Sequence, residues 1–93
     1  MSERVTRRLL VSGRVQGVGY RASMQMTAEA MGATGWVRNL RDGRVEAVVC
    51  GSPSQVEAIV AWAKRGPRSA IVDGVEVEEA SGDFSTFECR TTA

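Results

Sequence analysis

The 93-residue sequence contains no histidine and only two cysteines. The lack of histidine excludes catalytic triads and other mechanisms that need an imidazole base. Protein zinc sites draw mainly on histidine and cysteine, so two cysteines alone do not favour such a site, and we expect no metal and no cofactor. Cys50 and Cys89 lie far apart in apolar, strand-like segments. We expect both to be buried free thiols rather than a disulfide.

Long apolar runs and an excess of one charge are also missing. No run approaches the roughly 20 apolar residues of a membrane-spanning helix. The net charge is +1, so no overall basic field attracts nucleic acid or a membrane surface. The basic N-terminal segment precedes an apolar run too short for a signal peptide, and no small-residue cleavage site follows. We therefore expect a cytoplasmic protein with neither of these partners.

The composition is that of an ordinary globular protein, with 43% hydrophobic and 25% charged residues. The chain shows no internal repeat, linker or low-complexity segment. Its length fits one small domain over residues 1–93, with little stability to spare.

Three glycines, Gly13, Gly17 and Gly19, lie within seven residues in the stretch GRVQGVGYR, which ends at Arg21. A strand-like run precedes the stretch and a helix-compatible run follows it. A glycine-rich turn of this kind aims backbone N–H groups at one point beside the positive end of a helix dipole. Arginine can bind a phosphate through two parallel hydrogen bonds. The stretch therefore fits either a phosphate-binding loop or an ordinary glycine-containing turn with a surface arginine.

Hydrophobic periodicity predicts the remaining elements. Strands are expected at residues 5–12, 34–40, 44–50, 70–78 and 84–91, and a first helix at residues 20–31. Ser52 and Gln55 form a capping box for a second helix that starts at Pro53, and Gly66-Pro67 stops it. An Asp-Gly turn at residues 41–43 should join the second and third strands in a hairpin.

The same patterns indicate which side chains face the core. On the first strand these are Leu9 and Val11. The expected inward residues elsewhere are Tyr20, Met24, Ala28 and Met31 on the first helix, Val56, Ile59, Val60 and Ala63 on the second, and Phe87 and Cys89 on the last strand. Trp62 flanks its helical stripe and is expected to be partly buried.

The element order is βαββαβ with one added C-terminal pairing. Two helices can cover only one face of such a sheet, which predicts an α/β (α+β) fold of the ferredoxin-like kind. It is an open-faced sandwich with a mostly antiparallel sheet and two helices on one face. This fold hosts many unrelated activities, so it does not indicate a function by itself.

A second informative stretch is GWVRNLRDG, at residues 35–43. With both stretches in view, the chain resembles the acylphosphatase family: the first looks like its phosphate-binding signature and the second like its GWVxN-xxDG signature. Further matching positions are Ala28, Met31-Gly32, Gly66-Pro67 and the closing Phe-x-x-Phe run, so the resemblance covers nearly the whole chain. Tyr20 stands where phenylalanine is more usual, and Cys89 where an aliphatic residue is usual. Both keep apolar bulk.

The resemblance implies a metal-independent hydrolase that splits acyl phosphates into a carboxylate and inorganic phosphate. It implies that Arg21 binds the phosphate and that Asn39 orients the attacking water. The backbone N–H groups that would complete the phosphate-binding loop are those of Gln16, Gly17, Val18, Gly19 and Tyr20. The small-molecule substrate would be the partner of a monomeric enzyme.

Other interpretations of these residues remain open. Asn39 could instead make local backbone hydrogen bonds at the end of a hairpin strand. Three further arginines, Arg14, Arg38 and Arg41, are expected to be solvated surface charges that help attract anions.

Two other functions compete with hydrolysis. The chain could be an anion-sensing or interaction module, or a domain like the acylphosphatase-like parts of larger hydrogenase-maturation proteins that handle carbamoyl phosphate. It could also be an RNA-binding sheet, although that needs aromatic residues on the open sheet face and only Trp36 is a candidate. Hydrolysis of benzoyl or acetyl phosphate separates an enzyme from a binding module.

Overall fold

The computed structural model describes residues 3–93 and has five strands and two helices in that range. The elements are β1 (Val5–Arg14), α1 (Tyr20–Met31), β2 (Thr34–Asn39), β3 (Val45–Gly51), α2 (Pro53–Ala63), β4 (Ile71–Glu79) and β5 (Phe87–Cys89). Most bounds lie within two residues of those predicted. The last strand is much shorter than predicted, with three residues.

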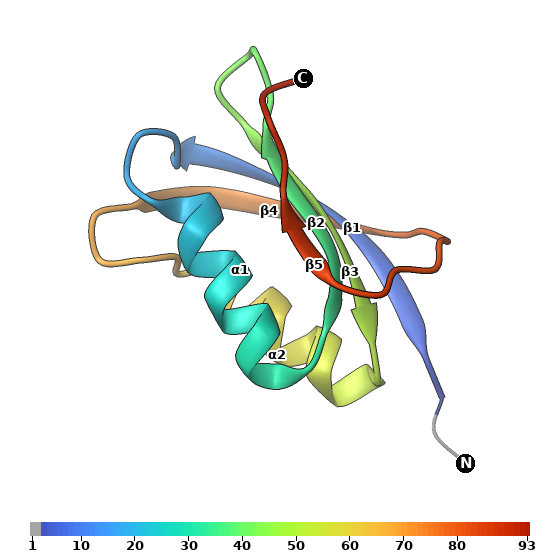
Figure 1. Ribbon diagram of the computed structural model, residues 1–93. Coiled ribbons are helices and arrows are strands. Elements are labelled where there is room, and N and C mark those ends of the chain that lie inside the picture. The colour runs from blue at the N-terminus through green and yellow to red at the C-terminus, as the bar shows by residue number, and fades with distance from the viewer. Residues whose placement is uncertain (1–2) are drawn as a thin grey trace.

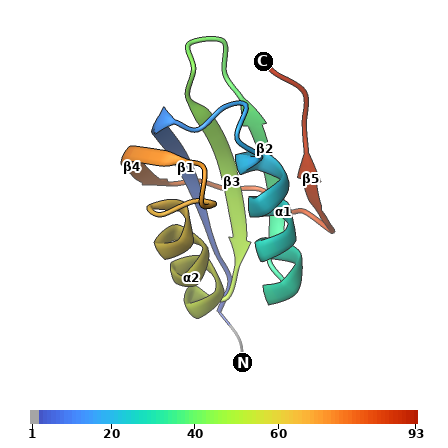
Figure 2. The same cartoon turned by 90° about the vertical axis from the view of Figure 1, so that its left-hand side faces the viewer.

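The strands form one sheet in the order β4-β1-β3-β2-β5. Neighbours pair antiparallel except β2 and β5, which are parallel. Both helices lie on the same face of this sheet (Figures 1 and 2). The predicted ferredoxin-like, open-faced sandwich with a mostly antiparallel sheet is confirmed.

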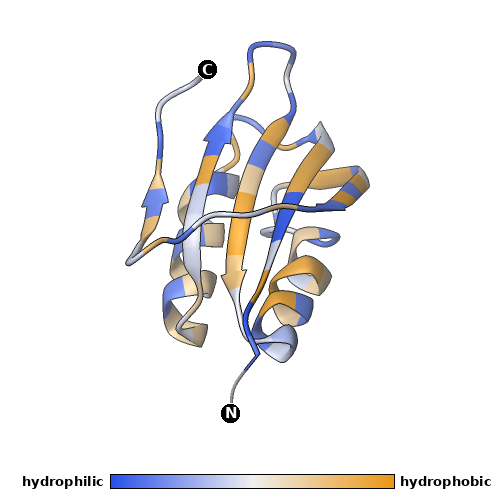
Figure 3. Cartoon of the chain, turned by 90° about the vertical axis from the view of Figure 1, so that its right-hand side faces the viewer, coloured by the Kyte–Doolittle hydropathy of each residue, from blue (hydrophilic) through white to orange (hydrophobic). Residues whose placement is uncertain are grey.

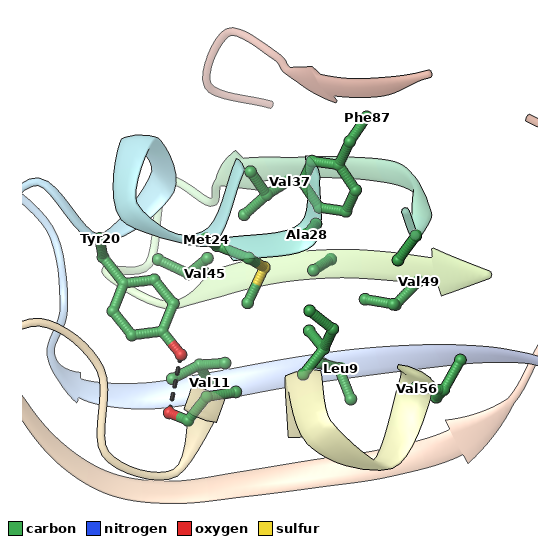
Figure 4. Packing of buried hydrophobic residues seen from close by; sticks show 14 of the residues in the cluster. Leu9, Val11, Tyr20, Met24, Ala28, Val37, Val45, Val49, Val56 and Phe87 are labelled. Carbon is green, nitrogen blue, oxygen red and sulfur yellow. Dashed lines mark hydrogen bonds between the residues drawn. The ribbon is translucent and has the colours of Figure 1, made fainter. Parts of the chain in front are cut away.

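The core fills the space between the sheet and the two helices (Figure 4). Leu9 and Val11 of β1 are fully buried, as predicted, and Tyr20, Met24 and Ala28 of α1 pack against the same cluster. The prediction for Met31 was wrong, because this residue is 39% exposed. It is the last residue of α1 and directly precedes the C-cap, Gly32.

The capping box of α2 is present as predicted. The Gln55 N–H donates to Ser52 Oγ at 3.2 Å, and the Ser52 N–H donates to Gln55 Oε1 at 2.8 Å. Gln55 Nε2 also donates to the Met31 carbonyl at 2.7 Å. One side chain therefore caps α2 and ties its start to the end of α1.

The connection from β4 to β5, residues 80–86, joins the two opposite edges of the sheet. It crosses the face that carries no helix (Figures 2 and 3). It begins with a hydrogen bond from the Ala80 N–H to the Thr6 carbonyl, 3.1 Å long. The face that the sequence predicts to be open is therefore partly covered by the chain itself.

Charged side chains on this face form ion pairs. Glu46 is buried and accepts hydrogen bonds from Arg38 at 2.7 Å and from Arg8 at 2.6 Å. Burial alone would raise the pKa of Glu46, but the two arginines outweigh it and the pKa lies below its ordinary value. The expectation that Arg38 is a solvated surface charge was therefore wrong, whereas Arg14 and Arg41 are exposed as predicted.

Gly35 of β2 lies too close to β3 for any side chain. Its φ is +135°, and a Cβ there would overlap the Val48 carbonyl oxygen of the neighbouring strand. We expect Gly35→Ala to lower the free energy of unfolding by about 2 kcal/mol or more, because both the backbone angle and the strand spacing must change. Urea unfolding measures this. Gly43→Ala is the control, since a Cβ at Gly43 meets no atom within 4 Å although its φ is also positive. A loss in Gly35→Ala no larger than in Gly43→Ala would contradict the steric argument.

Tyr20 makes the stability of the fold depend on pH in the alkaline range. Its ring is buried, and its hydroxyl donates to the Ala63 carbonyl at 2.8 Å (Figure 4). Burial raises the pKa of Tyr20 well above its ordinary value of 10.0. Above about pH 10 the unfolded chain therefore releases this proton while the folded chain keeps it, so stability falls as the pH rises.

Tyr20→Phe isolates this contribution. We expect the variant to be about 1 kcal/mol less stable than wild type near pH 9, because the Ala63 carbonyl loses its donor. The difference should shrink near pH 11, since phenylalanine has no proton to lose. Urea unfolding of both proteins at the two pH values measures it. A difference that stays constant or grows would contradict the coupling.

Candidate active site

The loop between β1 and α1, residues 15–19, contains two glycines with positive φ. Gly17 has φ +75° and Gly19 has φ +77°, and a Cβ at either position would meet no atom within 4 Å. The backbone angle, not a lack of space, favours glycine there. Gly13 has a different role: it lies at the irregularity in the β1–β4 pairing, where a Cβ would overlap the Ile71 carbonyl oxygen.

The loop leads into an uncapped helix N-terminus. Gly19 is the N-cap of α1, and no side chain accepts a hydrogen bond there. Within residues 3–93, the backbone N–H groups of residues 16–20 donate no hydrogen bond. The first turn of α1 also contains no acidic residue. These donors and the helix dipole together make the loop suitable for an anion.

A pocket of about 180 Å³ opens at this loop. It is lined by Val15, Gly17, Gly19, Tyr20, Arg21, Ala22, Asn39 and Cys89. Two glycines of the first motif, the arginine after them and the asparagine of the second motif thus meet in one place. The pocket is smaller than the roughly 300–1,000 Å³ typical of sites for drug-sized ligands, so it suits a small substrate.

Arg21 enters the pocket from the first turn of α1. Its Nη1 donates to the Arg90 carbonyl at 2.9 Å. No carboxylate of the described residues lies within ion-pair distance of its guanidinium. One end of the guanidinium is therefore anchored to the C-terminal segment, and its charge is not neutralised by a neighbour.

Asn39 enters the pocket from the end of β2. Its backbone carbonyl accepts a hydrogen bond from the Ala93 N–H at 3.0 Å. Its side-chain amide makes no hydrogen bond within the described part of the chain, so the alternative of local backbone bonding is not supported. The amide is left with both a donor and an acceptor for a ligand or a water.

Two of the three non-glycine residues of the loop, Gln16 and Val18, do not line the pocket, whereas Val15 does. Val18 is partly buried and packs against the core. The Gln16 side chain donates from Nε2 to two carbonyls of the β2–β3 connection, those of Leu40 at 2.7 Å and Arg44 at 2.8 Å. From the sequence, only the backbone N–H of Gln16 is predicted to be functional; no local pattern indicates the side-chain contact.

The prediction that Cys89 is a buried thiol was wrong, because Cys89 is exposed. The parallel pairing places Cys89 beside Val37, and Phe87 beside Gly35. Phe87 is buried as predicted, but Cys89 lies at the level where α1 begins and lines the pocket instead of the core. The alternation along the strand correctly predicts that Cys89 lies on the same side of the sheet as Phe87. It does not predict that α1 begins too late to cover Cys89. Cys50 is buried and free, as predicted.

The described residues contain neither a metal-binding cluster nor a membrane-spanning helix. Within residues 3–93, no three side chains of histidine, cysteine, aspartate or glutamate are grouped so that they could hold a metal ion. Neither α1 nor α2, the helices of this range, is long and apolar enough to cross a membrane.

These features define the class of protein: a ferredoxin-like domain with a cationic pocket at the N-terminus of its first helix. The model of the acylphosphatase family matches residues 7–89, and the chain belongs to this family. An acylphosphatase of Anaeromyxobacter dehalogenans (strain 2CP-C) is 52% identical over an alignment of 92 residues, which covers 97% of this chain and 99% of the relative.

Solved structures give the same result. An acylphosphatase from Coxiella burnetii superposes with a TM-score of 0.90 at 40% identity, over 94% of this chain and 93% of that one. An acylphosphatase from Bacillus subtilis has a TM-score of 0.88 at 34% identity, over 92% of this chain and 98% of that one.

Proposed function

We propose that this acylphosphatase hydrolyses the carboxyl–phosphate bond of small acyl phosphates with Arg21, Asn39 and the N–H groups of residues 16–20. The observation that carries the proposal is the single pocket shared by Arg21, Asn39 and the glycine-rich loop. The family match supports the substrate class, and the pocket supports the assignment of roles.

The loop and Arg21 bind the phosphoryl group in this proposal. The N–H groups of residues 16–20 converge on it from the loop, and the guanidinium supplies charge-assisted bonds. Negative charge on the phosphoryl oxygens is stabilised by donors that are already in place before the reaction, so little reorganisation is needed.

Asn39 holds the attacking water in line with the bond that breaks. The leaving group is a carboxylate whose conjugate acid has a pKa of about 4, so no strong general acid is required. The second pKa of a phosphate is about 6, which allows a phosphate oxygen of the substrate to accept the proton of the water. An enzyme without histidine can then act by positioning and charge stabilisation.

The test is a turnover assay with benzoyl phosphate, with glycerol phosphate as the comparison. We expect rapid hydrolysis of the first and very slow hydrolysis of the second, because no carboxylic acid or imidazole among the described residues lines the pocket to protonate an alkoxide. Comparable rates on the two substrates would contradict the proposed chemistry, and no turnover of benzoyl phosphate would support a binding module instead.

Inorganic phosphate should inhibit this reaction competitively. It offers the loop and Arg21 the same oxygens as the phosphoryl group of the substrate, so both ligands compete for one pocket. Initial rates at several substrate and phosphate concentrations measure the pattern. Purely noncompetitive inhibition would mean that the anion binds elsewhere.

The proposal also describes the enzyme as a metal-independent, monomeric, cytoplasmic domain that does not bind nucleic acid. The acidic edge strand β4, with Asp73, Glu76 and Glu79 exposed, disfavours pairing with a second sheet.

The ring of Trp36, the candidate for stacking on a nucleic-acid base, is already contacted by Arg38 and Arg90. Their guanidinium carbons each lie 4.8 Å from its ring centroid. Light scattering after size exclusion tests the monomer, and full activity after EDTA treatment is expected if no metal takes part.

A further inference from the structure

One side chain links the phosphate-binding loop to the hairpin that carries Asn39. Gln16 precedes Gly17, the first glycine of the pocket, and its amide donates to the carbonyl of Leu40, the residue after Asn39. The same nitrogen donates to the Arg44 carbonyl at 2.8 Å. Both N–H groups of one planar amide are therefore used on two backbone carbonyls.

These carbonyls belong to the first and last residues of the β2–β3 connection, Leu40 and Arg44. The Leu40 N–H donates to the Arg44 carbonyl at 2.8 Å, which closes the connection just beyond the sheet. The connection then extends past the end of the sheet (Figure 2). Gln16 thus contacts the hairpin at two residues. One directly follows Asn39, and the other directly precedes β3.

No other hydrogen bond within residues 3–93 joins residues 15–19 to residues 39–44. Without the Gln16 amide, the loop and the end of β2 would be connected only indirectly. One route is the β1–β3 pairing, which ends at Val11 and Val45. The other is the C-terminal segment, which accepts a hydrogen bond from Arg21 and donates one to the Asn39 carbonyl. Two segments that meet at a reacting bond need closer control than this, because a misplacement of about 1 Å can cost on the order of 10²-fold in rate.

We infer that Gln16 is a positioning residue that sets the Asn39 amide relative to the phosphate-binding loop. The inference rests on the proposed roles of Asn39 and of the loop. Gln16 acts through its side chain on the hairpin, and its backbone N–H remains part of the loop. Removing the side-chain amide therefore loosens the placement of the water while the phosphate keeps its own donors.

The test uses Gln16→Met, which keeps a long side chain but donates no hydrogen bond. We expect kcat on benzoyl phosphate to fall on the order of 10-fold. The inhibition constant of inorganic phosphate should change less than about threefold, because Arg21 and the backbone N–H groups remain. Gln25→Met is the matched control: Gln25 Nε2 also ties two elements, donating to the Phe87 carbonyl at 3.1 Å, but does not reach the hairpin. Its kcat should equal that of wild type.

A double-mutant cycle with Asn39→Ala separates positioning from general stability. If Gln16 acts through Asn39, Gln16→Met should change kcat less than about twofold in the Asn39→Ala background. An equal loss in both backgrounds would overturn the inference, as would an unchanged kcat in Gln16→Met or a loss of phosphate inhibition. Gln16→Leu, which is uncharged and also cannot donate a hydrogen bond, replaces Gln16→Met if that variant does not fold. Failure of the proposed function is distinct, because it shows as no turnover by wild type or as full kcat in Asn39→Ala alone.

Discussion

Arg21→Lys is expected to lower kcat/KM on benzoyl phosphate by on the order of 10²-fold or more, even though the positive charge is kept. The guanidinium has several donors in a fixed plane. One of them, Nη1, is fixed on the Arg90 carbonyl at 2.9 Å, which leaves the others to face the phosphoryl oxygens. A lysine ammonium is a single point on a flexible chain, so it cannot be anchored and bind two phosphoryl oxygens in the same geometry.

The control for Arg21→Lys is the same exchange at Arg14, an exposed arginine that does not line the pocket. Arg14→Lys should keep the kinetics of wild type. Both variants must unfold at the urea concentration of wild type to within a few tenths of 1 M, so that the kinetics report the site and not the fold. If Arg21→Lys were nearly as active as wild type, charge alone would be sufficient and the two-point binding would have to be abandoned.

The features that the sequence predicts correctly are those that local chemistry determines. The capping box of Ser52 and Gln55 and the stop at Gly66-Pro67 define α2 without tertiary information. Alternation along β1 identifies Leu9 and Val11 as core residues. The two motifs that carry the family resemblance contain Arg21 and Asn39, and these residues line one pocket. Their roles in the reaction stay a prediction.

The features that the sequence does not predict depend on contacts between distant segments. Cys89 is exposed because α1 begins too late to cover it, and Arg38 is paired because Glu46 lies on the neighbouring strand. The two bonds of the Gln16 amide join residues 24 and 28 positions apart. No periodicity or composition encodes such pairings, since they follow only from the register of the strands and the path of the loops.

Asn39→Ala is expected to lower kcat on the order of 10²-fold while phosphate affinity stays within a few fold. The amide has no hydrogen-bond partner within the described residues, and Asn39 lines the same pocket as the loop glycines and Arg21. In the proposed mechanism, a group that orients the water contributes mainly in the transition state, whereas the phosphate is bound by the loop N–H groups and the guanidinium. The loss should therefore be in kcat, with the phosphate inhibition constant nearly unchanged.

The Asn39→Ala variant is expected to fold, because the backbone of Asn39 makes the contacts that hold the end of β2. The carbonyl that accepts the Ala93 N–H and the pairing with Val45 do not involve the side chain, so alanine should leave β2 in place. Circular dichroism and urea unfolding check this, and Gln25→Ala, which truncates an amide away from the pocket, should keep the kcat of wild type. A folded Asn39→Ala protein that kept its kcat but lost phosphate inhibition would make Asn39 a ligand for the phosphate. The water-positioning role, and with it the reason for the Gln16 contact, would then be wrong.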